Sequence, residues 1–134
     1  MTGLQLEVAM GDFAALRLDP GAAVPSWAFQ GDGFSAVVRT ATELSLLVRS
    51  SVVPTGFDGE VEPGWRGLFV RGKLEFGLVG ILADLTACLA GEGVGILAVS
   101  TFDTDWLFVK AEELERARQA LSRAGHTVAS APLP

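Results

Sequence analysis

The chain has 134 residues, of which 49% are hydrophobic and 19% are charged, and its formal net charge is −6. This composition favours one packed domain, or two very small ones, over a disordered chain. The ten basic residues are scattered, whereas nucleic acids and anionic membranes require clustered Lys and Arg, so we expect neither as a partner.

Cysteine and histidine each occur once, as Cys88 and His126. A single cysteine cannot form an internal disulfide, and the two residues are too small a set for a zinc site. Cys88 falls in an apolar helical pattern, which favours a small buried hydrophobe over a reactive thiol. His126 follows a glycine that ends a predicted helix and has no visible catalytic partner, so we expect it at the surface.

The glycine spacing, the first residues and the apolar runs of the sequence indicate which cofactors and which location to expect. The glycines at 91, 93 and 95 follow a predicted helix instead of opening one, so they are no dinucleotide fingerprint, and we expect neither a metal nor another cofactor. The opening residues, MTGLQLEVAMGDF, do not resemble a signal peptide, and no apolar run approaches the roughly 20 residues of a membrane span. We therefore expect a cytoplasmic protein.

The first part of the chain is predicted to form short strands. Alternation of apolar and polar residues indicates strands at 4–10, 13–19, 34–40 and 44–50. Residues 24–29, VPSWAF, suggest a single helical turn beginning near a proline. A segment rich in Gly and Pro follows from residue 50 to 64, and we interpret it as the connection between two halves.

The second part changes its hydrophobic period twice. In chain order it predicts a strand at 65–72, an amphipathic helix within 73–93, a pair of strands at 96–99 and 106–109, a helix at 111–125 and a last strand at 126–130. The order β-α-β-β-α-β is that of the ferredoxin-like fold. We therefore predict an α+β protein of two ferredoxin-like modules side by side, an abbreviated one at 1–60 and a complete one at 61–134.

The segment from residue 70 to 121 also resembles the ACT domain, a small-molecule regulatory module. It reads VRGKLEFGLVGILADLTACLAGEGVGILAVSTFDTDWLFVKAEELERARQAL. Its patterns G-x-L-x-F-x-L-x-G-I-L at 72–82 and S-T-F-D-T-D at 100–105 are similar to those of bacterial tandem ACT proteins and, in turn, of the cytosolic arginine sensors. The resemblance covers essentially the whole chain and is looser in the first half, at TELSLLV.

The resemblance implies that the protein binds a small ligand, such as an amino acid, at the interface between two ACT-like modules and is not an enzyme. It also implies which positions contact that ligand. These are Ser45 and Leu46 on a strand of the first half, Gly72, Lys73, Leu74, Glu75 and Phe76 in the loop entering a helix, and Thr101, Phe102 and Asp105 at a strand turn.

The residue types at these positions allow a specific chemistry. The N-terminus of a helix opening near Gly72 suits a carboxylate, and Asp103 with Asp105 could bind an ammonium or guanidinium group. The alternative for the two aspartates is a solvated turn; we favour Asp105 as the ligand contact, while Asp103 is as well explained as a turn former. Glu75 could bind a cationic group or simply complement the helix dipole.

Two other functions remain open at this point. The protein could be a docking or oligomerisation module that needs no ligand and uses the ferredoxin-like faces and exposed tryptophans. A small enzyme on this scaffold ranks last, because no nucleophile–base pair or metal set is visible. The expected partners are a small molecule together with a second copy of the chain or a regulated protein.

Overall fold

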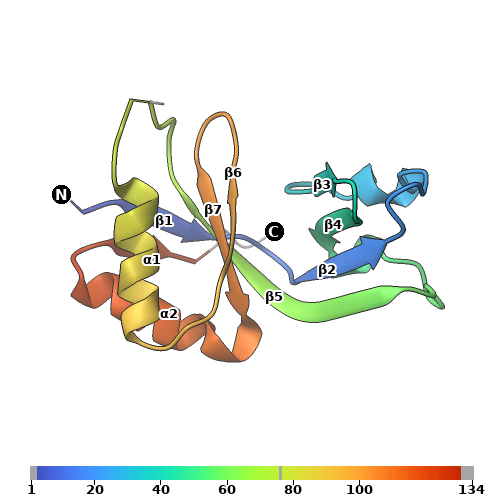
Figure 1. The fold of residues 1–134 in the computed structure, drawn as a ribbon. Coiled ribbons are helices and arrows are strands. Elements are labelled where there is room, and N and C mark those ends of the chain that lie inside the picture. Colours follow the sequence, from blue (N-terminus) through green and yellow to red (C-terminus); the bar gives the residue numbers. More distant parts are fainter. Residues whose placement is uncertain (1–2, 76, 131–134) are drawn as a thin grey trace. The chain divides into compact units, whose positions relative to one another are not determined.

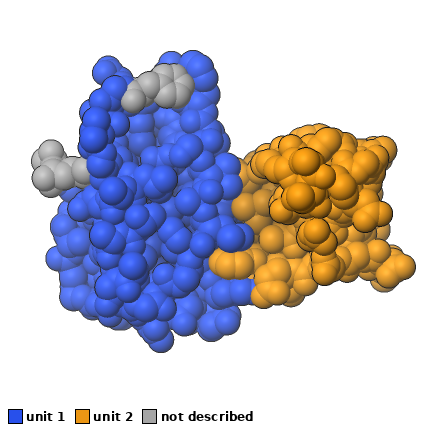
Figure 2. Space-filling model, viewed as in Figure 1, with its two compact units in different colours: residues 1–10, 66–134 blue, residues 11–65 orange. Residues whose placement is uncertain are grey.

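The computed structural model describes residues 3–75 and 77–130 (Figure 1). The chain is α+β and divides into two compact units, coloured separately in Figure 2: unit 1 comprises residues 1–10 with 66–134, and unit 2 comprises residues 11–65. The boundary expected between residues 60 and 61 lies inside strand β5, Glu60–Val70. The N-terminal strand therefore belongs to the same unit as residues 66–134.

Unit 1 is a mixed sheet with two α-helices. Its strands are β1 (Gln5–Val8), the second part of β5, β6 (Leu97–Ser100), β7 (Asp105–Lys110) and β8 (Thr127–Ala129). They lie in the order β6-β7-β5-β1-β8, in which β1 is antiparallel to β5 and parallel to β8. The central place of β1 could not be read from the sequence, because local periodicity shows that a strand exists but not which strand it pairs with.

One hydrophobic core joins both helices to the sheet. Helix α1 (Ile81–Gly91) and helix α2 (Leu114–Arg123) bury Leu85, Leu89 and Leu121. These leucines cluster with alternate residues of β1, β5 and β7, so both helices cover the same face of the sheet. The predicted second helix and the hydrophobic period of α1 are thereby confirmed. None of the helices in the described part of the chain combines the length and the apolarity needed to cross a bilayer.

Helix α1 begins later than the sequence indicated. The prediction that a helix opens near Gly72 is wrong, because the first helical residue is Ile81. Gly72 and Gly80 have φ values of +87° and +86°. This left-handed conformation is open to glycine but cannot continue a right-handed helix. The glycines in the motif therefore make a loop before the helix, and the helix N-terminus lies at residues 81–83.

Unit 2 is an antiparallel sheet with its own core. Its strands β2 (Phe13–Leu18), β3 (Ala36–Arg39) and β4 (Leu44–Arg49) and the first part of β5 lie in the order β3-β4-β2-β5. Residues 11–65 are all described and contain two short 3-10 helices, Ser26–Phe29 and Ser50–Val52, but no α-helix. The first of these is the predicted helical turn. The last residues of the predicted irregular connection, 60–64, are strand because they pair with β2.

The expected exposure of His126 is wrong, and so are the exposed tryptophans of the docking alternative. His126 is buried, because its ring nitrogens find hydrogen-bond partners in segments far away in the sequence. Trp65 is buried as well, and Trp27 and Trp106 are half-buried, so none of the tryptophans is exposed. Cys88 is half-buried and donates its S–H to the Ala120 carbonyl oxygen, with 3.2 Å between Sγ and O.

Candidate functional site

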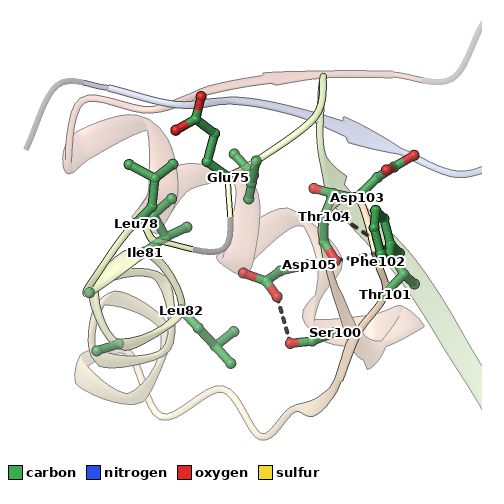
Figure 3. A pocket seen from close by; sticks show the side chains of 13 residues that line it. Glu75, Leu78, Ile81, Leu82, Ser100, Thr101, Phe102, Asp103, Thr104 and Asp105 are labelled. Carbon is green, nitrogen blue, oxygen red and sulfur yellow. Dashed lines mark hydrogen bonds between the residues drawn. The ribbon is translucent and has the colours of Figure 1, made fainter.

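A pocket of about 300 Å³ lies in unit 1, between the start of α1 and the turn that joins β6 to β7 (Figure 3). Three segments form its wall: the loop before α1, the first residues of α1 and the β6–β7 turn. The lining residues are Leu74, Glu75, Leu78, Gly80, Ile81, Leu82, Ala83, Ser100, Thr101, Phe102, Asp103, Thr104 and Asp105. All of them except Ala83 belong to the two motifs at 72–82 and 100–105 on which the resemblance depends.

Hydrogen bonds define the shape of the β6–β7 turn. The backbone N–H of Thr101 donates to the Thr104 carbonyl oxygen at 2.8 Å, and the Thr104 N–H donates to Thr101 Oγ1 at 3.2 Å. Thr104 Oγ1 donates to the carbonyl oxygen of Val70, at the end of β5, at 2.7 Å. The two threonines therefore fix the turn within itself and against the neighbouring strand.

The loop before α1 is attached to this turn at its beginning. The Leu74 N–H donates to the Asp103 carbonyl oxygen at 2.6 Å. The Lys73 ammonium lies 5.5 Å from the centroid of the Phe102 ring, within the range of a cation–π interaction. These contacts join residues 73–74 to residues 102–103 and close one side of the pocket.

The two aspartates of the turn differ in environment. Asp105 is the first residue of β7 and is half-buried, and its Oδ1 accepts a hydrogen bond from Ser100 Oγ at 2.6 Å. In Figure 3 the Asp105 carboxylate extends into the space between the turn and α1, while the Asp103 carboxylate points away from it. Asp103 is exposed and contributes its backbone carbonyl to the turn.

The opposite wall of the pocket is the N-terminus of α1. Its N-cap residue is Gly80, and no side chain caps the helix. The first N–H groups of a helix have no partner within it and carry the positive end of the helix dipole. Residues 81–83 at this N-terminus thus line the same pocket as Asp105, whose carboxylate extends toward α1 (Figure 3).

The remaining lining groups are apolar or acidic. Leu78, Ile81, Leu82 and Phe102 provide apolar surface, and Leu78 and Phe102 are 54% and 70% exposed. Three of the described lining residues are acidic, Glu75, Asp103 and Asp105, although the Asp103 carboxylate points away from the pocket, and none is basic. A bound molecule with a cationic group would meet acceptors on the side of the turn.

The structure brings half of the residues predicted from the resemblance into this pocket. Leu74, Glu75, Thr101, Phe102 and Asp105 line it. Gly72 and Lys73 precede them in the same loop, and Phe76 lies outside the described residues. Ser45 and Leu46 are in β4 of unit 2, where Leu46 is a core residue.

Sequence reasoning missed several contributors to the pocket, among them Ser100 and the first residues of α1. Ser100 was not expected there, although it holds Asp105, and residues 81–83 were missed because the helix was expected to open earlier. Apart from Ala83, these residues fall within the two motif segments, so the motif boundaries were the available signal. Elsewhere, the described residues contain no group of three or more His, Cys, Asp or Glu arranged to hold a metal ion.

Comparisons with known proteins agree with this architecture. The family model of the ACT domain matches residues 60–123, and a model described as an N-terminal domain matches residues 11–56. No curated protein sequence matches the chain.

Among solved structures, a protein from Agrobacterium tumefaciens is 33% identical, with a TM-score of 0.90, and the match covers 99% of this chain and 97% of that one. A Vibrio cholerae protein of unknown function is 20% identical over 92% of this chain and 91% of that one, with a TM-score of 0.72. The regulatory subunit of aspartate kinase from Thermus thermophilus, in its ligand-free form, is 14% identical over 89% of this chain and 95% of that one, with a TM-score of 0.63. Residues 60–123 of the chain therefore form an ACT domain.

Proposed function

We propose that the chain is a regulatory protein that binds a free amino acid in the pocket of unit 1. ACT domains are regulatory modules that bind small molecules such as amino acids, and a fold neighbour is the regulatory subunit of an amino-acid kinase. The observation that carries the proposal is the pairing, across one pocket, of an uncapped helix N-terminus with a half-buried carboxylate.

This pairing suits the two charged groups that every free amino acid carries. The α-carboxylate accepts hydrogen bonds from the N–H groups of residues 81–83, where the helix dipole favours a negative charge. The α-ammonium donates to Asp105, whose other partner, Ser100 Oγ, keeps the carboxylate in place. Thr101 lines the same wall of the pocket, where its hydroxyl is hydrogen-bonded to the Thr104 backbone and fixes the turn.

The other residues that line the pocket would contact the side chain of the ligand. Apolar groups of Leu78 and Leu82 can contact methylene groups, and Glu75 offers a further acceptor. With three acidic and no basic side chains among the described lining residues, a ligand with an aliphatic stem and a cationic end satisfies the pocket best. We therefore expect L-lysine and L-arginine to bind more tightly than acidic amino acids.

A ligand that contacts both α1 and the β6–β7 turn favours the arrangement in which the distance between these two elements matches the length of the ligand. If only one arrangement binds the ligand well, binding changes the populations of the two, and a second copy of the chain or a regulated protein can respond to that change.

Isothermal titration calorimetry with each of the twenty amino acids tests the proposal. We expect saturable heat for a small subset that includes a basic amino acid. If the folded protein gives no heat with any of them, the proposed function is wrong.

A second function is favoured by a separate observation. Leu78, Val79 and Phe102 are 54%, 90% and 70% exposed, and all three lie on the loop or turn that forms the pocket. Exposed apolar side chains grouped in this way are typical of a surface that docks another protein. In that case Asp105→Ala would leave assembly unchanged, whereas Val79→Ser with Phe102→Ser would abolish it, as measured by sedimentation.

A further inference from the structure

The buried histidine of unit 1 joins three segments that are distant in the sequence. His126 is 5% exposed and lies between α2 and β8. Its Nδ1 accepts a hydrogen bond from the backbone N–H of Leu4 at 3.0 Å. Its Nε2 lies 3.1 Å from Oδ2 of Asp84, in the first turn of α1. The imidazole ring therefore connects the segment before β8, the segment before β1 and the first turn of α1.

The two partners determine where the ring carries its proton. The Leu4 N–H can only donate, so Nδ1 has to be unprotonated. The Asp84 carboxylate accepts, so the proton lies on Nε2 and is donated to Oδ2. A neutral ring in this tautomer satisfies both nitrogens with protein partners alone.

The bond to Asp84 acts on the wall of the pocket. Asp84 directly follows Ala83, which lines the pocket, and its N–H makes the first hydrogen bond of the helix, to the Gly80 carbonyl oxygen at 2.9 Å. The other end of α1 is also held: Arg123 pairs with the Glu92 carboxylate at 2.6 Å, and Arg116 donates to the Glu92 carbonyl oxygen at 3.3 Å. The helix that supplies the N–H groups of the pocket is thus fixed at both ends by side chains from beyond it.

We propose that His126 is a positioning residue for the pocket: through Asp84 it holds the first turn of α1 where residues 81–83 and Asp105 can bind the two ends of one molecule. The consequence for ligand affinity rests on the proposed function. The positioning of α1 by His126 does not, because it concerns the protein without ligand.

Nitrogen-15 NMR of the imidazole tests the tautomer directly. The chain contains a single histidine, so the ring signals need no assignment by mutation. At neutral pH we expect a protonated Nε2 and an unprotonated Nδ1. A ring with its proton on Nδ1, or with both nitrogens protonated, would overturn the proposal.

A matched pair of substitutions separates the hydrogen bond from the charge. The Asp84 side chain is 47% exposed, so both Asp84→Ala and Asp84→Asn are expected to fold. Both remove the negative charge from the first turn, but the Oδ1 of asparagine can still accept from Nε2. If the hydrogen bond positions the helix, Asp84→Ala disturbs the start of α1 and Asp84→Asn leaves it as in wild type. If only the negative charge matters, the two substitutions have equal effects.

Hydrogen exchange in the free protein measures the helix start. We expect the amides of residues 84–87 to exchange about tenfold faster in Asp84→Ala and within about twofold of wild type in Asp84→Asn, since each tenfold change corresponds to about 1.4 kcal/mol. Wild-type exchange in Asp84→Ala, or equal acceleration in both variants, would show that the pair does not position the helix.

Titration with L-lysine and L-arginine measures the effect on binding. We expect Asp84→Ala to weaken the affinity of the amino acid that binds wild type about five- to tenfold, and Asp84→Asn to weaken it less than about twofold. If neither amino acid binds wild type, the specificity expected under the proposed function fails, while the exchange rates and the NMR tautomer still decide the positioning role. Equal affinities in wild type and Asp84→Ala would remove the link between His126 and the pocket.

Discussion

Asp103 and Asp105 are one residue apart, yet the turn gives them different tasks. Asp105 is half-buried, accepts from Ser100 Oγ and extends toward α1, whereas Asp103 is exposed and holds the loop by its backbone carbonyl. A side-chain substitution at Asp103 leaves that carbonyl in place. A substitution at Asp105, in contrast, removes the carboxylate itself.

We therefore expect unequal effects when each aspartate is changed to asparagine. Asp105→Asn should weaken amino-acid binding at least about tenfold, because asparagine can still accept a hydrogen bond but lacks the negative charge that strengthens the bond to an ammonium group. Asp103→Asn should change it less than about threefold, because the Debye length near 8 Å at physiological ionic strength screens an exposed charge. Calorimetric titration of both variants makes the comparison, and equal losses would show that the ligand contact has been assigned to the wrong residue.

Cys88 shows how a half-buried residue can respond to pH. Burial raises the pKa of the Cys88 thiol above its ordinary value of 9.0, and the Asp84 carboxylate adds to the effect. The folded protein therefore favours the neutral thiol, and the stability that it contributes is complete below pH 9 and is lost as pH rises through the raised pKa.

Chemical denaturation of wild type and Cys88→Ala over this range tests the sign. Above pH 9 the free energy of unfolding should fall more steeply for wild type than for Cys88→Ala. Parallel curves for the two proteins would show that the thiol titrates alike in the folded and unfolded chains. Below pH 9 the difference between the two proteins should not depend on pH, which provides the control.

The close approach of Gly3 to Gly125 can be tested by single substitutions. A Cβ added at Gly3 would lie 2.1 Å from the carbonyl oxygen of Gly125, whereas one added at Gly91 would meet nothing within 4 Å. We expect Gly3→Ala to lower the free energy of unfolding by about 1–3 kcal/mol, as overpacking does. Gly91→Ala, at the last helical position, should leave stability unchanged or raise it by about 0.5–1 kcal/mol, and equal Tm values for the two variants would contradict the close approach.

Strand β1 is the element on which unit 1 depends most. It lies between β5 and β8 and pairs with both, and it buries Leu6 and Val8 in the same core as the two helices. Without β1, both neighbours would expose an unpaired edge and the core would lose two of its apolar side chains.

A chain that begins at residue 11 is therefore expected to lack a folded unit 1. Near-ultraviolet circular dichroism should lose the signal of Trp106 in β7, and the amides of α1 and α2 should exchange as in an unfolded chain. A full chain carrying Gln5→Thr serves as the control, because this substitution changes one exposed side chain of β1 and keeps the strand. Cooperative unfolding of unit 1 in the shortened chain would show that β1 is dispensable.

The elements could be predicted from the sequence to the extent that they depend on local patterns. The period of Leu85 and Leu89 indicated α1, and alternation indicated most strands. The start of α1 could not be derived, since hydrophobic spacing continues through residues 78–82 and gives no sign of the positive φ at Gly80. The burial of His126 was missed for a related reason, because Leu4 and Asp84 lie 122 and 42 residues away in the chain.

The pocket was predictable only in part, and for the same physical reasons. Its two walls correspond to two sequence motifs, so the resemblance located Asp105 and Glu75 without a structure. The helix wall depends on where α1 begins, which the motif alone did not reveal. Ser100 was overlooked because its role is to support another side chain, and such a role becomes visible only when the distance between the two is known.

At the scale of the whole molecule, the two units have separate cores, and the pocket is lined by residues of unit 1 alone. A ligand in that pocket stabilises the folded state by mass action, by about 2.7 kcal/mol when its concentration is 100 times Kd. Hydrogen exchange with saturating L-lysine should therefore show the largest gain in protection at the start of α1 and the β6–β7 turn. D-lysine is the control, because inversion at the α-carbon misplaces one of the two charged groups, and equal protection by both would argue against the proposed pose.

The position of β1 also has a consequence for how the protein is made. Residues 11–65 form unit 2 and leave the ribosome as one continuous stretch, so this unit can fold while synthesis continues. Strand β1 emerges before unit 2, whereas its partners β5 and β8 end at residues 70 and 129. Until α1 and α2 have also been synthesised, the apolar side chains Leu6 and Val8 have no complete core to enter. A strand synthesised before unit 2 thus gains its first partner only with β5, and it is enclosed on both sides only when β8 has emerged.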